Sequence, residues 1–256
     1  GAASDFMNLK NEDSDFFFQG YLDPEQLRAG YATGSREARD LLAGYAAGYN
    51  RYLKDYAGRL PAACNNAPWV RPISLEDMYL VLAEKALHGS GQVFAKEIVD
   101  GARDPQSPAA FGAPTRVDKL DPSFVQERLA KLTGQLGSNA LGIGKDLSAD
   151  GHGILLGTAH YPWKSTDRFW EVHLTVPGRY DAMGVILGGI PAVVIGFNRD
   201  VAWSHTVTAA AHFTTFTLEL DTRDPTGTTY ISDGIPVKMT SRTVRVDSLH
   251  PDGSLR

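Results

Sequence analysis

The sequence predicts an α+β protein in which helices come first and a largely antiparallel sheet follows. In the first half of the chain, apolar residues recur every three or four positions, which is the period of an amphipathic helix. From about residue 137 the period changes to two, and short runs rich in β-branched and aromatic residues alternate with turn residues. Because the two patterns are segregated along the chain, we divide it into residues 1–137, mostly helical, and residues 138–256, rich in strands.

Three helices of the first half have readable boundaries. Ser35 precedes a segment with one stripe of apolar and aromatic side chains, which we interpret as core packing; the stripe consists of Leu41, Tyr45, Tyr49, Tyr52 and Tyr56. Ser74 begins a Ser-Leu-Glu-Asp sequence typical of a capping box, and the helix that follows is expected to stop at Gly89. After a loop over residues 101–118, a short helix is expected from Asp121-Pro122 to Gly134.

The second half contains several expected strands. They cover residues 154–158, 168–176, 183–187, 192–197 and 213–220. Asn198-Arg199-Asp200 is expected to form a hairpin turn between Val193–Phe197 and Val201–Trp203.

Composition excludes several classes of function. The 256 residues are 43% hydrophobic and carry a formal charge of −5, so the chain is an ordinary globular polypeptide without the basic face that nucleic acids require. No apolar run approaches the roughly 20 residues that span a bilayer. The single Cys64 cannot form an internal disulfide. The histidine pairs His205/His212 and His152/His160 lack the spacing and the further ligands of a zinc site, so we expect no metal.

Both ends suggest an internal piece of a larger protein. Residues 1–20 lack the charged-then-apolar pattern of a signal peptide. Residues 244–248 stop in strand-like alternation without a closing element.

The most informative position is the junction at residue 137. A serine after glycine is by itself more typical of a turn than of a nucleophile, but here it opens a series of motifs in a specific order. The series consists of Gly137-Ser138-Asn139-Ala140, Ala159-His160-Tyr161-Pro162-Trp163, Gly188-Gly189-Ile190-Pro191 and Val201-Ala202-Trp203-Ser204-His205-Thr206-Val207, with Gly48-Tyr49-Asn50-Arg51-Tyr52-Leu53 upstream. The series resembles the penicillin acylase family of N-terminal-nucleophile hydrolases, in particular its branch of aculeacin-type and acyl-homoserine-lactone acylases.

The resemblance implies a four-layer αββα sandwich and a precursor that cuts itself between Gly137 and Ser138. A spacer of about residues 105–137 is expected to be excised. The hydroxyl of Ser138 would attack the preceding carbonyl, and water would hydrolyse the resulting ester. Cutting frees an α-amine with a pKa of about 7.7–8.0, which can take the proton of the hydroxyl. The cut thus supplies the base that the serine otherwise lacks.

The resemblance also assigns the remaining roles. Val207 would contribute a backbone N–H to the oxyanion hole, and His160 would lie beside the nucleophile. The second oxyanion donor, an asparagine side chain, is expected beyond residue 256. The segment from Ala209 to Phe213 has no carboxylate where related enzymes bind calcium, so calcium is doubtful and no cofactor is expected.

The expected substrate is an N-acylated small molecule, either a fatty-acyl lipopeptide or an N-acyl-homoserine lactone. Tyr161, Trp163, Met78 and Leu82 are candidates for the lining of an apolar acyl slot. The processed halves would form an α/β heterodimer, secreted or periplasmic. Two alternatives remain open: a β-lactam acylase of the penicillin V type, and an extracellular β-rich binding module without turnover.

Overall fold

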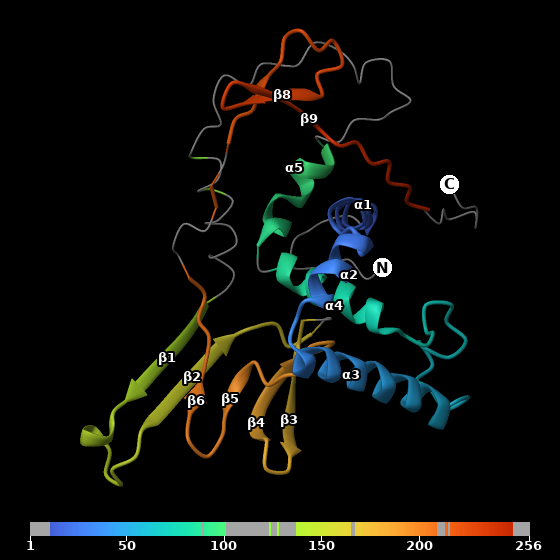
Figure 1. Ribbon diagram of the computed structural model, residues 1–256. Helices are drawn as coiled ribbons and strands as arrows, with labels where there is room; N and C mark the ends of the chain where they lie inside the picture. Colours follow the sequence, from blue (N-terminus) through green and yellow to red (C-terminus); the bar gives the residue numbers. More distant parts are fainter. Residues whose placement is uncertain are drawn as a thin grey trace. The chain divides into compact units, whose positions relative to one another are not determined.

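The computed structural model describes residues 11–88, 90–100, 123, 127, 137–164, 167–208, 213–214 and 216–247. Within these ranges, helices α1 to α5 end by residue 100 and strands β1 to β9 begin at residue 137 or later (Figure 1). The predicted α+β class with segregated elements is therefore confirmed. The expected loop over residues 101–118 lies outside the described residues, as does the helix from Asp121 to Gly134 apart from the helical residues Ser123 and Glu127.

The chain folds into two compact units. Unit 1 comprises Gly1–Tyr21, Gly91–Gln135 and Thr208–Arg256, and unit 2 comprises Leu22–Ser90 and Leu136–Val207. Each unit takes residues from both sides of residue 137. The compact units therefore cut across the sequence division between a helical and a strand-rich segment.

Unit 1 combines two helices with a small sheet. Helix α1 (Asn11–Tyr21) contacts α5 (Ala95–Asp100), which follows the 3-10 turn Gly91–Phe94, and Phe17 is fully buried. Strands β7 (Glu219–Leu220), β8 (Thr229–Ser232) and β9 (Ile235–Lys238) form a three-stranded antiparallel sheet. The strand expected over residues 213–220 is wrong for most of its length, since only its last two residues pair with a neighbour among those described.

Unit 2 contains three helices whose starts follow from local hydrogen bonds. Helix α2 spans Pro24–Ala32, α3 spans Arg36–Asp55 and α4 spans Leu75–His88. The Ser35 hydroxyl accepts from the Ala38 N–H at 3.1 Å, so Ser35 is the N-cap of α3. At α4 the Ser74 hydroxyl accepts from the Asp77 N–H at 3.2 Å, while the Asp77 carboxylate accepts from the Ser74 N–H at 2.7 Å. This reciprocal pair is the predicted capping box.

The helices of unit 2 share a small apolar core. It is formed by Leu42 and Ala46 of α3 with Met78 and Tyr79 of α4. The tyrosine stripe contributes less to it than predicted, because Tyr52 and Tyr56 are 45% and 44% exposed. Their rings stack on each other at 4.6 Å on the surface. The buried residues of α3 are Leu42 and Ala46, which are smaller than tyrosine and lie beside the stripe. The tyrosines can remain exposed because their phenol groups form hydrogen bonds with water.

The strands of unit 2 form two antiparallel sheets. Strand β1 (Gly137–Ile143) pairs with β2 (Ile154–His160). The second sheet has the order β3 (Phe169–Val176), β4 (Tyr180–Leu187), β5 (Ile195–Phe197), β6 (Ala202–Trp203). The predicted turn between β5 and β6 is confirmed, since the Asn198 side chain accepts from the N–H groups of Asp200 and Val201, both at 2.8 Å.

One close approach ties the helices of unit 2 to the sheet. The Gly189 N–H donates to the Tyr45 hydroxyl at 3.1 Å. Gly189 has φ +88°, and an added Cβ would collide with the Val81 side chain on α4. Only glycine fits both the backbone angle and the space.

Candidate active site

The structure brings Ser138 and His160 to the same end of the β1–β2 ladder. In the antiparallel register, Gly137 pairs with His160, Ser138 with Ala159, and Asn139 with Thr158. Directly paired residues project from the same face of a sheet, and the faces alternate along each strand. Ser138 and Ala159 therefore share one face, while His160 lies on the other, beside Gly137.

The hydroxyl of Ser138 contacts the bond that is predicted to be cut. It donates a hydrogen bond of 2.5 Å to the Gly137 carbonyl oxygen, and the serine is half-buried. No imidazole or carboxylate of the described part of the chain hydrogen-bonds this hydroxyl. The arrangement therefore places the hydroxyl of the predicted nucleophile beside its own preceding carbonyl, with no side-chain base bonded to it among the described residues.

The imidazole of His160 covers Gly137. A Cβ added at Gly137 would lie only 2.9 Å from His160 Nδ1. The other ring nitrogen, Nε2, lies 3.2 Å from the Asn139 side-chain nitrogen. With that amide as donor, a neutral His160 carries its proton on Nδ1, the nitrogen that faces Gly137. Asn139 is thus the residue that orients the ring.

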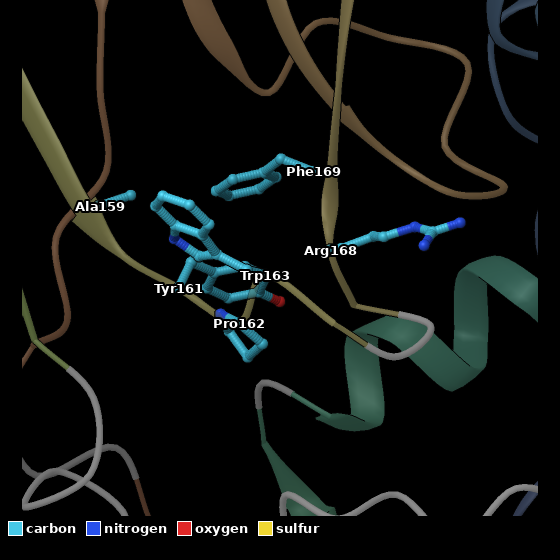
Figure 2. Close-up of a pocket in the computed structure, with 6 residues that line it drawn as sticks. All are labelled: Ala159, Tyr161, Pro162, Trp163, Arg168 and Phe169. Carbon is cyan, nitrogen blue, oxygen red and sulfur yellow. The ribbon is translucent and has the colours of Figure 1, made fainter.

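An aromatic hollow opens next to Ser138. It has a volume of about 320 Å³ and is lined by Ala159, Tyr161, Pro162, Trp163, Arg168 and Phe169 (Figure 2). Ala159 is the direct cross-strand partner of Ser138, so the hollow begins on the face that carries the hydroxyl. Tyr161 and Trp163, both predicted to contact substrate, lie in its wall.

The lining of the hollow is more apolar than polar, and its polar side chains are either uncharged or directed elsewhere. The Tyr161 and Phe169 rings stack at a centroid distance of 4.5 Å, while Trp163 is 93% exposed at the rim. Burial, with the nearby Asp167 and Glu84 carboxylates adding to it, raises the pKa of Tyr161 to about 12, so its phenol stays uncharged. Figure 2 shows the Arg168 side chain extending away from these rings, and its guanidinium lies over Trp170 at 4.3 Å.

The structure places Met78 and Leu82 away from this hollow. Met78 is 1% exposed in the core between α3 and α4, and Leu82 packs against that core. Neither residue lines the hollow, although both were candidates for the acyl slot. Helical periodicity predicts that a side chain is buried, but it does not predict which cavity that side chain lies beside.

Val207 lies after β6, and its side chain is exposed. Among the residues described, no hydrogen bond connects it with Ser138. The neighbouring positions 209–212 lie outside the described residues, and so does the expected spacer apart from Ser123, Glu127 and Gly137. The role of Val207 remains a prediction.

The described residues contain no cluster of three or more His, Cys, Asp or Glu side chains arranged for a metal ion. No helix among them has the length and apolarity needed to cross a membrane.

Comparison with known proteins agrees with the resemblance in the motifs. Residues 1–253 match the family described as penicillin amidase. The acyl-homoserine lactone acylase PvdQ of Pseudomonas syringae pv. syringae is 41% identical over 250 residues, which cover 96% of this chain and 31% of that protein. Aculeacin-A acylase of Actinoplanes utahensis is 37% identical over 231 residues, which cover 88% of this chain and 28% of that protein. The chain therefore spans about a third of the length of the curated relatives it matches.

Proposed function

The chain belongs to the penicillin amidase family, and from that premise we propose that it carries the nucleophile and part of the acyl-binding wall of an amidase acting on N-acylated small molecules. The observation that carries the proposal is the position of Ser138, directly across the β1–β2 ladder from a residue that lines an aromatic hollow. A nucleophile beside an apolar hollow suits the cleavage of a bond between a polar head group and an apolar acyl chain.

In the proposed first step, the precursor cuts itself. The Ser138 oxygen attacks the Gly137 carbonyl carbon, the C–N bond breaks, and the nitrogen takes a proton to become the free α-amine. Water then hydrolyses the ester between the two residues. The hydrogen bond from the hydroxyl to the Gly137 carbonyl supports this step, because it keeps the nucleophile next to the group it attacks.

In the proposed second step, the freed amine acts as the base. It takes the proton of the Ser138 hydroxyl, directly or through one water, while the oxygen attacks the acyl carbonyl of the substrate. The backbone N–H of Val207 is proposed to stabilise the negative oxygen of the tetrahedral intermediate, a contribution typically worth about 3–4 kcal/mol. His160, held by Asn139, is proposed to orient the amine end of Ser138.

The proposed substrates are acylated homoserine lactones or acylated lipopeptides. Relatives named acyl-homoserine lactone acylase and aculeacin-A acylase support this class. The hollow supports it as well, since stacked rings and an uncharged phenol accept an alkyl chain without leaving a buried charge unpaired.

The wider architecture is proposed on the same family basis. We propose that the sheets belong to an αββα sandwich and that the processed protein is a heterodimer of the two pieces. Secretion or a periplasmic location is proposed too, and fractionation of producing cells would test it.

The nucleophile is tested with Ser138→Ala in the full-length protein. We expect intact mass and end sequencing to show separation between Gly137 and Ser138 in the wild type and none in the variant, with deacylation lost as well. Ser148→Ala, which removes a hydroxyl from the turn after β1, is the matched control and should process normally. Normal processing and deacylation by Ser138→Ala would show that the nucleophile lies elsewhere.

The substrate class is tested by comparing kcat/KM for dodecanoyl-homoserine lactone and penicillin V. We expect the fatty-acyl substrate to be preferred. A strong preference for penicillin V would instead favour a β-lactam acylase. Processing without hydrolysis of either substrate would contradict the proposed substrate class but not the self-cleavage.

A further inference from the structure

A buried ion pair connects the end of α4 with the residues that precede β3. Lys85 lies in the last turn of α4, and its Nζ is 2.8 Å from Oδ1 of Asp167. The two side chains are only 9% and 7% exposed. Long charged side chains are rarely buried this far unless a specific partner holds them.

Two more ionisable groups of α4 complete the cluster. His88 Nε2 lies 2.6 Å from Oε1 of Glu84, and His88 Nδ1 lies 3.8 Å from Oδ2 of Asp167. The second carboxylate oxygen of Glu84 is 3.5 Å from the Lys85 ammonium. The Asp167 carboxylate therefore contacts α4 through both of its oxygens.

The cluster adjoins the aromatic hollow. Asp167 is followed directly by Arg168 and Phe169, which line the hollow, and Phe169 stacks on Tyr161. Helix α4 is itself fixed, because Met78 and Tyr79 lie in the helical core. A fixed helix thus holds the start of β3 through Asp167, at the point where β3 forms the wall.

We propose that Lys85 is a positioning residue: its ion pair with Asp167 holds the Arg168–Phe169 wall of the hollow and so determines how tightly a long acyl chain is bound. This inference rests on the proposed function, in which the hollow receives the acyl chain. Lys85 precedes the proposed cut at residue 137 and Asp167 follows it, so in the processed protein this wall is held by a contact between two separate chains.

The test compares Lys85→Met with wild type in the processed full-length protein, using butanoyl- and dodecanoyl-homoserine lactone. Because the dodecanoyl chain is eight carbons longer than the butanoyl chain, we expect it to contact more of the wall. We expect KM for the dodecanoyl substrate to rise about tenfold, because roughly two of its methylene groups would lose their contact with the wall. We expect kcat to stay unchanged. KM for the butanoyl substrate should stay the same, and Lys85→Arg should restore most of the binding of the long chain.

Lys96→Met is the matched control, because Lys96 pairs with Asp100 at 2.7 Å on an exposed helix surface. It should leave both substrates unaffected. If Lys85→Met changes neither substrate, or weakens both equally, the proposal is wrong. If Lys85→Met does not accumulate as folded protein, Asp167→Asn is used instead, because it removes the carboxylate charge with little change of side-chain shape. The proposal is then wrong if Asp167→Asn changes KM for neither substrate or weakens both equally. Failure of both variants to fold would assign the pair to stability alone and overturn the proposal.

Binding of dodecanoate separates this inference from the proposed function. Calorimetric titration with the fatty acid needs no turnover, and we expect Lys85→Met to weaken its binding about tenfold. If the wild type binds dodecanoate but hydrolyses neither lactone, the proposed activity is contradicted. The effect of Lys85→Met on dodecanoate affinity would still test the inference about Lys85. Unchanged dodecanoate affinity in Lys85→Met, or none in the wild type, would overturn the inference.

Discussion

Gly137 has no room for a side chain, because the His160 ring lies against its α-carbon. An added methyl group would sit 2.9 Å from Nδ1, closer than carbon and nitrogen approach without a bond. Either the imidazole or the β1 backbone would have to shift. Since Gly137 supplies the carbonyl that Ser138 is proposed to attack, a shift there changes the geometry of the cut.

We therefore predict that Gly137→Ala slows self-cleavage about tenfold to a hundredfold without unfolding the protein. The measurement is a time course of precursor separation by intact mass. Gly142→Ala is the control, because Gly142 lies on the same strand and an added Cβ there meets nothing within 4 Å. Cleavage of Gly137→Ala at the control's rate would show that the His160 contact is not needed for the cut.

The sequence named the central residues of the candidate site, whose catalytic roles stay predictions, but it did not name the residues that contact them. Ser138, His160 and Tyr161 occur in a specific order of motifs, and that order pointed to them. Asn139 contacts His160 only because the β1–β2 register places them together, and Lys85 reaches Asp167 across 82 positions of sequence. Such contacts depend on tertiary structure, so no local pattern indicates them.

At the scale of elements, the start of α4 is stabilised by charge as well as by capping. The Asp77 carboxylate accepts from Arg71 Nη2 at 2.7 Å and from both the N–H and the hydroxyl of Ser74. The hydrogen bond from Arg71, followed by the bonds from Ser74, holds the pKa of Asp77 well below its usual range. A depressed pKa means that the ionised carboxylate stabilises the folded state.

We predict that Asp77→Asn lowers the free energy of unfolding by about 1–2 kcal/mol at pH 7. The wild-type advantage should be complete above the unfolded pKa of about 3.9 and should shrink as the pH falls towards the depressed folded pKa. Urea denaturation of both proteins at a series of pH values measures this difference. Asp40→Asn removes an exposed partner of Arg36 and should cost less than about 0.5 kcal/mol. A cost for Asp77→Asn that is independent of pH would contradict the charge argument.

Helix ends were easier to predict than strands, because caps are local chemistry. Ser35 and Ser74 each mark a helix start through side-chain bonds to residues three positions away. The strand expected over residues 213–220 relied on β propensity, which needs a pairing partner to be realised. The β8–β9 hairpin was missed although its turn was readable: Asp233-Gly234 has φ +50° and +78°, the Asp-Gly turn typical of two-residue hairpins.

At the scale of the whole molecule, residues on the two sides of the proposed cut contact each other within each of the two compact units. In unit 2, Tyr45 bonds to Gly189 and Lys85 to Asp167. In unit 1, Phe94 packs edge-to-face on Phe213 at 5.1 Å. Every one of these contacts joins a residue before position 137 to a residue after it.

We predict that the two pieces of the cleaved protein stay together in native buffer and separate only under denaturing conditions. Each piece would leave buried apolar and charged groups without partners if it dissociated, which is far costlier than the entropy gained by release. Size-exclusion chromatography should give one peak that resolves into two bands on a denaturing gel. The uncut Ser138→Ala protein, the control, should elute at the same volume and give one band. Elution of the wild-type pieces as separate native peaks would contradict the prediction, and would mean that contacts across residue 137 do not hold the folded protein together.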